Sequence, residues 1–137
     1  MQLDLIILRQ LSESIDNINS DTINLSIPFA NIAFIKEKFW KTNPNYARSD
    51  EKRNSHPCLS ISSSNNKVIF GTSKVKNRNP KDVISVSKKD CEIINQNMIF
   101  LKDFWIYADI CMIDTSKSEY APVSDRIKME LENAGYR

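Results

Sequence analysis

Apolar residues recur at three- and four-residue steps near both ends of the chain, which is the spacing of an amphipathic helix. Over residues 3–19, leucines and isoleucines fall on one helical face, with polar residues between them. We expect this helix, within an accessory segment 1–22, to lie across a sheet or a partner. Residues 122–135 repeat the helical spacing and end at Gly135, a typical stop signal. The sequence therefore predicts an N-terminal and a C-terminal helix.

Between these two segments the pattern changes to short apolar or alternating runs separated by polar stretches. Such a pattern is typical of an antiparallel sheet or a small barrel. The runs that predict strands are 31–36, 58–62, 67–70, 82–87, 91–101 and 104–113. The polar stretch 63–66 predicts a hairpin connection. We therefore expect a single, mainly β domain, with the sheet or barrel over residues 23–121.

Two polar stretches interrupt the predicted strands. The stretch from Trp40 to Ser55 contains little that could pack and predicts a long mobile loop, and residues 72–81 predict a second, basic loop. Long loops in compact domains are often functional. Because the chain has only two glycines, we expect Gly71, which precedes the second loop, to occupy a backbone position that other residues would fill badly.

Length and composition describe one globular domain, since 41% of the 137 residues are hydrophobic and 26% are charged. The three cysteines, Cys58, Cys91 and Cys111, are an odd number with apolar neighbours and predict buried free thiols. With His56 the only histidine and no Cys-x-x-Cys pair, we expect no zinc site and no other cofactor. No stretch approaches the roughly 20 apolar residues of a membrane span, so we expect a cytoplasmic protein without a membrane partner.

The charge of the chain is unevenly distributed. The formal net charge of +2 is too small to indicate a nucleic-acid partner. Residues 41–81, however, hold nine basic residues against Asp50 and Glu51. This basic segment is either a solvated loop surface or a surface for a polyanion.

Two predicted strand ends carry the candidate chemistry. The segment 56–61 reads His-Pro-Cys-Leu-Ser-Ile, and the segment 68–74 reads Val-Ile-Phe-Gly-Thr-Ser-Lys. The pair resembles the PemK/MazF family of toxin endoribonucleases, in which an arginine-proline or histidine-proline dipeptide opens one strand and the next strand ends in a threonine-serine pair. The aromatic run 104–113 and the segment 119–122 are also similar to that family. The resemblance covers residues 28–122.

This resemblance implies a small SH3-like β-barrel, usually a homodimer, that cleaves single-stranded RNA without a metal. In a toxin-antitoxin system such an enzyme is neutralised by a bound antitoxin protein. Metal-free cleavage of RNA needs a base for the 2′-hydroxyl proton, an acid for the departing 5′-oxygen and cations around the phosphate.

The catalytic residues that the resemblance implies are His56, Thr72 and Ser73. Thr72 matches the catalytic threonine of the family, and Ser73 keeps the pair. The catalytic arginine of the family precedes the strand-opening proline, and His56 occupies that position here. An imidazole titrates near pH ~6.5 and can serve as acid or base, whereas arginine supplies only charge and donors. Arg53, three residues upstream, could supply the missing charge.

Substrate binding is assigned to three kinds of residue around these positions. Glycine allows a ligand to approach the backbone closely, basic side chains neutralise phosphates, and aromatic rings stack on bases. The residues are Gly71, the basic Arg53, Lys74, Lys76 and Arg78, and the aromatic Trp40 and Tyr46.

Other interpretations stay open beside the endoribonuclease. A non-catalytic SH3-like module could bind nucleic acid or a protein through the same groove, and a structural or host-interaction protein could use the N-terminal helix as its contact surface. A histidine before a proline is often only a hydrogen-bonded or surface residue, and Gly-Thr-Ser after a strand is commonly a turn. Trp105 and Tyr107 are expected in the core or in an interface rather than under a substrate.

Overall fold

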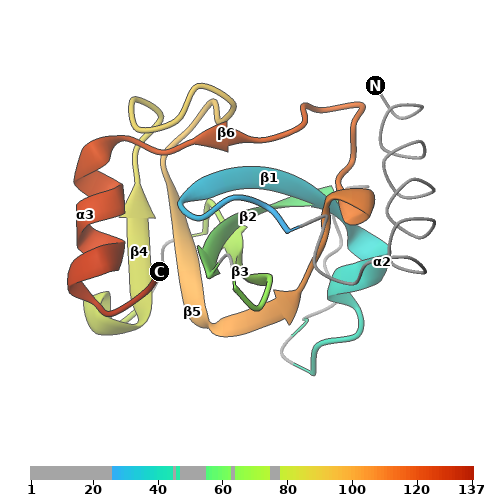
Figure 1. Cartoon of the computed structure of the whole chain (residues 1–137), viewed down its shortest axis with the longest axis horizontal. Helices are drawn as coiled ribbons and strands as arrows, with labels where there is room; N and C mark the ends of the chain where they lie inside the picture. Colours follow the sequence, from blue (N-terminus) through green and yellow to red (C-terminus); the bar gives the residue numbers. More distant parts are fainter. Residues whose placement is uncertain (1–25, 45, 47–54, 63, 75–77) are drawn as a thin grey trace, which may run out of the picture.

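A computed structural model describes residues 26–137, apart from 45, 47–54, 63 and 75–77. The described residues form one curled, antiparallel six-stranded sheet, a half-barrel, together with two α-helices (Figure 1). In spatial order the strands are β4 (Val83–Val86), β5 (Met98–Tyr107), β3 (Lys67–Thr72), β2 (Ser55–Ser62), β1 (Asn31–Lys36) and β6 (Ala121–Pro122). The helices are α2 (Glu37–Trp40) and α3 (Asp125–Asn133), with short 3-10 helices at Pro80–Asp82 and Ile110–Met112. The predicted mainly β class and C-terminal helix are confirmed, and the predicted helix 3–19 lies outside the described residues.

The strand β2 lies at the centre of the fold. Seven of its eight residues are buried, and it pairs with β1 on one edge and with β3 on the other. This buried run, Ser55 to Ile61, includes polar as well as apolar side chains. The hydroxyl of Ser60, within this run, donates to the carbonyl of Ile27 at 3.0 Å, so its polar group is satisfied. The predicted hairpin connection to β3 is confirmed, with Asn66 at φ 61°, a conformation that asparagine tolerates.

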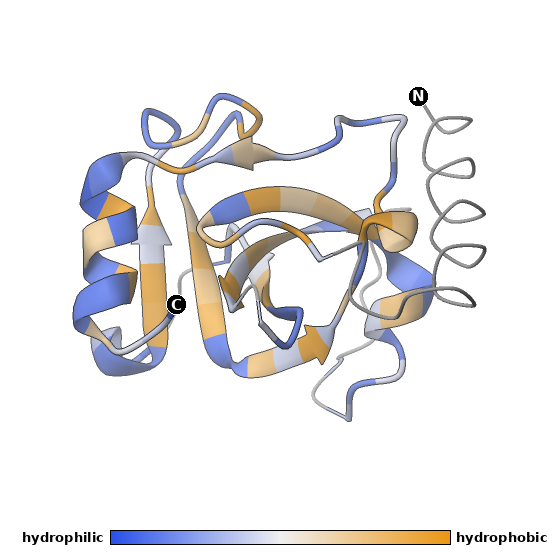
Figure 2. Ribbon diagram, in the orientation of Figure 1, coloured by the Kyte–Doolittle hydropathy of each residue, from blue (hydrophilic) through white to orange (hydrophobic). Residues whose placement is uncertain are grey.

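Each face of the sheet carries its own hydrophobic cluster. On one face Ile127 and Leu131 of α3 pack with Leu59 and Phe100 of the sheet. Figure 2 shows hydrophobic residues of α3 alternating with hydrophilic ones, as expected for a helix with one buried side. The other cluster gathers around Trp40 of α2, which is fully buried.

The surroundings of Gly71 confirm that other residues would fill this position badly. A Cβ atom built on Gly71 would lie 2.5 Å from Cε1 of Phe100, whose ring is fully buried. The glycine therefore makes room for a core ring on the neighbouring strand.

The chain after β5 returns to β1 and curls the sheet. Ser26 forms a bridge with Asp109, and Ile35 forms one with Ile113. The amide of Asp114 then donates to the carbonyl of Phe34 at 2.7 Å, before β6 pairs with the same edge of β1.

This return corrects the two strands predicted over 91–101 and 104–113. A single strand, β5, begins at Met98 and ends at Tyr107. The Asp109 side chain accepts a hydrogen bond from the amide of Cys111 and so begins a 3-10 helix. The apolar run continues past Tyr107, but a side-chain hydrogen bond to the backbone ends the extended conformation.

Three further boundaries differ from the predictions. Trp40 belongs to α2 and not to a loop, because α2 follows β1 without a break and the indole packs in the core. The strand β3 extends through Thr72 and therefore includes the start of the predicted basic loop. The helix α3 begins at Asp125, because Pro122 pairs with Asn31 as part of β6.

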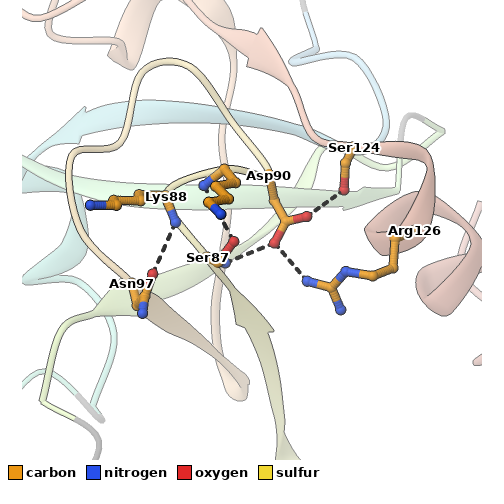
Figure 3. A network of polar contacts seen from close by, with 7 residues as sticks. Ser87, Lys88, Asp90, Asn97, Ser124 and Arg126 are labelled. Atoms are coloured by element: carbon orange, nitrogen blue, oxygen red, sulfur yellow. Dashed lines mark hydrogen bonds and ion pairs between the residues drawn. The ribbon is translucent and has the colours of Figure 1, made fainter.

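Asp90 fastens α3 to the turn after β4 (Figure 3). Its carboxylate accepts hydrogen bonds from the Ser124 hydroxyl at 2.6 Å, from Arg126 at 2.6 Å and from the Ser87 amide at 2.8 Å. The Asp90 carbonyl also accepts from the Ser124 amide at 2.7 Å. Burial would raise the pKa of Asp90, but these hydrogen bonds outweigh it and hold the pKa well below its usual range.

All three cysteines are free thiols. Cys58 and Cys91 are buried as predicted, and Cys111 is only half-buried. Burial raises the pKa of the Cys58 thiol to about 12. Within the described ranges, we find no helix with the length and apolar character that crossing a membrane requires.

Candidate functional site

His56 lies near the start of β2, where it pairs with Ile35 of β1 and is 7% exposed. Its ring centroid is 5.0 Å from that of Phe70 and 6.3 Å from that of Tyr46. The imidazole therefore stands among aromatic rings at one end of the sheet, and Tyr46, assigned to the same site from the sequence, is close to it.

A carboxylate that the sequence did not indicate accompanies this imidazole. Glu37, the first residue of α2, places Oε2 3.5 Å from Nε2 of His56. Its Oε1 atom is 3.3 Å from Nζ of Lys41, one helical turn later, and Tyr46 hydrogen-bonds to the same carboxylate. Because β1 ends next to His56 and passes directly into α2, the backbone itself brings Glu37 to the imidazole.

The electrostatics of this group favour an ionised carboxylate. Burial would raise the pKa of Glu37, but hydrogen bonds with Lys41, Tyr46 and His56 lower the pKa below its ordinary value. Burial, and next the negative charge of Glu37, raise the pKa of Tyr46. We call Glu37, Tyr46 and His56 the histidine cluster. A carboxylate next to an imidazole fixes the ring orientation and stabilises its protonated form.

Thr72 lies on the same face of the sheet as His56. Cys58 of β2 pairs with Phe70 of β3, and His56 and Thr72 lie two residues from this pair on their respective strands. Side chains two residues apart on a strand share a face, so both side chains lie on the face of Phe70. The two residues on which the family resemblance depends therefore share one face of the sheet.

The threonine hydroxyl takes part in a turn that leaves the sheet. Its oxygen accepts a hydrogen bond from the amide of Lys74 at 3.1 Å. Thr72 and Ser73 are half-buried, whereas Lys74 and Arg78 are exposed. The described part of the predicted basic rim therefore faces solvent beyond the end of β3. Arg53 and Lys76 lie outside the described residues.

Two of the sequence assignments are corrected. Trp40 is 0% exposed, with its ring 5.0 Å from Phe70 and 5.7 Å from Phe104, so neither face of the indole is open to a nucleotide base. Gly71 is explained by the ring of Phe100 and not by the approach of a ligand.

Trp105 and Tyr107, expected in the core or in an interface, have different environments. Trp105 is half-buried and packs against the cluster that contains Leu59 and Phe100, whereas Phe104 and Ile106, on the opposite face of β5, belong to the cluster around Trp40. Tyr107, the last residue of β5, is 58% exposed, so exposure fits the interface expectation for Tyr107 alone.

In the described part of the chain, no three histidine, cysteine, aspartate or glutamate side chains gather as ligands of a metal ion. No protein-family model matches the sequence, and no curated protein matches it. The chemistry of the site therefore has to be argued from its own residues.

Proposed function

We propose that the protein is a toxin-like, metal-independent endoribonuclease that cleaves single-stranded RNA on an SH3-like barrel of the PemK/MazF type. The observation that carries this proposal is the contact of His56 with Glu37, at 3.5 Å, on the sheet face that also holds Thr72. The group supplies an acid–base side chain, a carboxylate that tunes it and a hydroxyl donor for the phosphate, which are part of what metal-free RNA cleavage needs.

In this reaction the 2′-oxygen of a ribose attacks the adjacent phosphorus, and the bond from phosphorus to the 5′-oxygen breaks. The products are a 2′,3′-cyclic phosphate and a 5′-hydroxyl end, so no water or other reactant is consumed. We assign to His56 the removal of the 2′-hydroxyl proton. The imidazolium that forms would then be stabilised by Glu37. The departing 5′-oxygen takes a proton from solvent, and the imidazolium later releases the abstracted proton to solvent, so that protons balance. Since Nε2 faces Glu37, proton exchange with the RNA is assigned to Nδ1.

Thr72 is assigned to the phosphate. Its oxygen already accepts from the Lys74 amide, and its own hydroxyl hydrogen can be donated to a non-bridging phosphate oxygen. Ser73 would supply a second hydroxyl, and the exposed Lys74 and Arg78 would neutralise charge that accumulates on the phosphate. Arg53 and Lys76 are proposed to extend this rim, and Tyr46 to contact a base.

The family resemblance adds partners to the proposal. We infer a homodimer whose activity is blocked by a bound antitoxin protein, in the cytoplasm. These assignments rest on the resemblance of the segments 56–61 and 68–74 alone.

Cleavage of a long single-stranded RNA in EDTA tests this function directly. Wild-type protein, His56→Ala and Thr72→Ala are compared on a sequencing gel, with Ser85→Ala, an exposed residue of β4, as the matched control. We expect discrete cuts from the wild type and the Ser85 variant, and none from the other two. Intact RNA with folded wild-type protein would contradict the proposal, as would activity that survives the loss of His56.

The second candidate is a non-catalytic SH3-like module that binds nucleic acid or a protein. The burial of His56 favours it, because a 7% exposed ring packed beside Phe70 can have a purely structural role. Under this alternative His56→Ala would lower stability and leave binding intact, whereas the RNA would stay uncut in every variant.

A further inference from the structure

A pocket of about 520 Å³ lies between the turn that follows α2 and the second half of β5. Its lining includes Phe39, Asn43, Asp103, Trp105, Tyr107 and Met112. None of these residues belongs to the histidine cluster, so the pocket is a separate feature of the molecule.

The local fold explains why this part of β5 is open. The strand β4 pairs with β5 only along Met98–Leu101, and beyond Leu101 the turn after α2 takes its place beside β5. The side-chain amide of Asn43 donates to the carbonyl of Trp105 and fixes the turn to the strand. The backbone amide of Asn43 donates in addition to the carbonyl of Trp40 at 3.0 Å, which holds the turn to the end of α2.

Two lysine ammonium groups lie over aromatic rings of residues that line the pocket. Nζ of Lys38 is 5.0 Å from the ring centroid of Phe39, and Nζ of Lys67 is 4.5 Å from that of Trp105. The Trp105 and Tyr107 rings are 5.0 Å apart at 63°, and Tyr107 is 58% exposed. Exposed aromatic rings with flanking ammonium groups are how proteins hold single-stranded nucleic acid, with bases on the rings and phosphates at the cations.

The polar lining suits a base as well. Asp103, an exposed residue of the lining, brings a carboxylate to the pocket, and carboxylate oxygens accept hydrogen bonds from the amino and imino groups of bases. A purely apolar peptide would not use the lysines, and an acidic peptide would meet the carboxylate of Asp103 without using the rings.

We propose that this pocket binds an unpaired base of a single-stranded nucleic acid, which stacks on Trp105 and Tyr107 while Lys38 and Lys67 neutralise the neighbouring phosphates. This inference goes beyond the proposed function, because it requires binding and not cleavage. It also gives the exposed ring of Tyr107 a defined ligand.

Binding of a single-stranded 2′-deoxyoligonucleotide of about ten nucleotides, in EDTA, tests the proposal. This probe lacks the 2′-hydroxyl and cannot be cleaved by the proposed mechanism, so the result is independent of the endoribonuclease assignment. Binding is followed by quenching of Trp105 fluorescence and by calorimetry. We expect the single strand to bind more tightly than a duplex of the same sequence.

Tyr107→Ala is the decisive variant, because an exposed tyrosine can be removed without opening the core. Its affinity should fall roughly tenfold, since a base–aromatic stack contributes on that scale. Tyr120→Ala removes another exposed tyrosine, 39% exposed and outside the pocket, and should bind as the wild type does. Lys67→Gln should weaken binding and reduce its salt dependence by about one counterion.

Equal affinity of wild type, Tyr107→Ala and Lys67→Gln would overturn the proposal. If RNA stays uncut while Tyr107→Ala still loses the oligonucleotide, the proposed function fails and the base pocket stands. The reverse result would retain the enzyme and remove the pocket.

Discussion

Glu37 and His56 form a carboxylate–imidazole pair across the end of β1, with 3.5 Å between Oε2 and Nε2. The two residues are far apart along the chain, and the pairing of Ile35 with His56 brings them together. The pair connects the fold to the proposed chemistry, because a tuned imidazole is what an acid–base reaction requires.

Replacing Glu37 tests that connection without an activity assay. His56 is the only histidine, so its imidazole signals in an NMR titration need no assignment. In Glu37→Gln the titration midpoint should move to lower pH, because the carboxylate no longer stabilises the imidazolium. Glu92→Gln, at an exposed residue far from the histidine cluster in the sequence, is the control and should leave the midpoint unchanged. An unchanged midpoint in Glu37→Gln would show that the two groups are not coupled.

The Asp90 network predicts a loss of stability in acid. The folded-state pKa of Asp90 is lowered, so its contribution is complete above the unfolded value near ~3.9 and is lost as the pH falls below it. Asp90→Asn should lower the free energy of unfolding at pH 7 by about 2 kcal/mol and reduce its change below pH ~4. Urea unfolding between pH 3 and 7 measures both effects.

Arg126→Ala separates the ion pair from the rest of this network. The Arg126 side chain is 62% exposed, so its removal should cost only up to about 1 kcal/mol. A loss as large as that of Asp90→Asn would mean that the guanidinium, and not the Ser124 and Ser87 donors, dominates the contact.

Gly71→Ala should destabilise the core through a clash with Phe100. The added methyl group would lie 2.5 Å from the ring, and overpacking of this kind costs about 1–3 kcal/mol. Phe100→Leu in the same chain should recover part of the loss, because it removes the atoms that the methyl group meets. Thermal unfolding of the single and double variants gives the coupling, and strict additivity would argue against the clash.

Thiol reactivity should separate the cysteines of the folded protein. Cys58 is fully buried with a pKa of about 12, so at pH 8 it carries almost no thiolate. Half-buried Cys111 should therefore react with a disulfide reagent well before Cys58, which should react only on unfolding. Mass spectrometry of partly labelled protein identifies the site, and early label on Cys58 would contradict the packing described for β2.

The sequence was informative where a pattern is local. A short apolar run placed β1 at residues 31–36, and alternation over 82–87 predicted the strand β4. The need for glycine at position 71 was also predicted, although the reason, the ring of Phe100, lies on another strand. Composition alone was sufficient to expect free thiols.

Non-local features could not be predicted in the same way. The role of Glu37 depends on the register of β1 against β2, which no periodicity reveals. The residues that follow Trp40 have the composition of a loop, yet tertiary packing with Phe70 and Phe104 buries its indole. The run 104–113 is apolar except for Asp109, whose side chain accepts from the Cys111 amide and begins the 3-10 helix that follows the strand.

The pairing of β1 also sets an order for folding during synthesis. One edge of β1 is covered by β2, but the other edge waits for Ile113, Asp114 and β6, which are made much later. Until the ribosome has released that part of the chain, β1 presents open backbone groups that a neighbouring polypeptide could pair with. A product truncated before Asp109 would keep this open edge permanently, so premature termination should yield a species prone to aggregation.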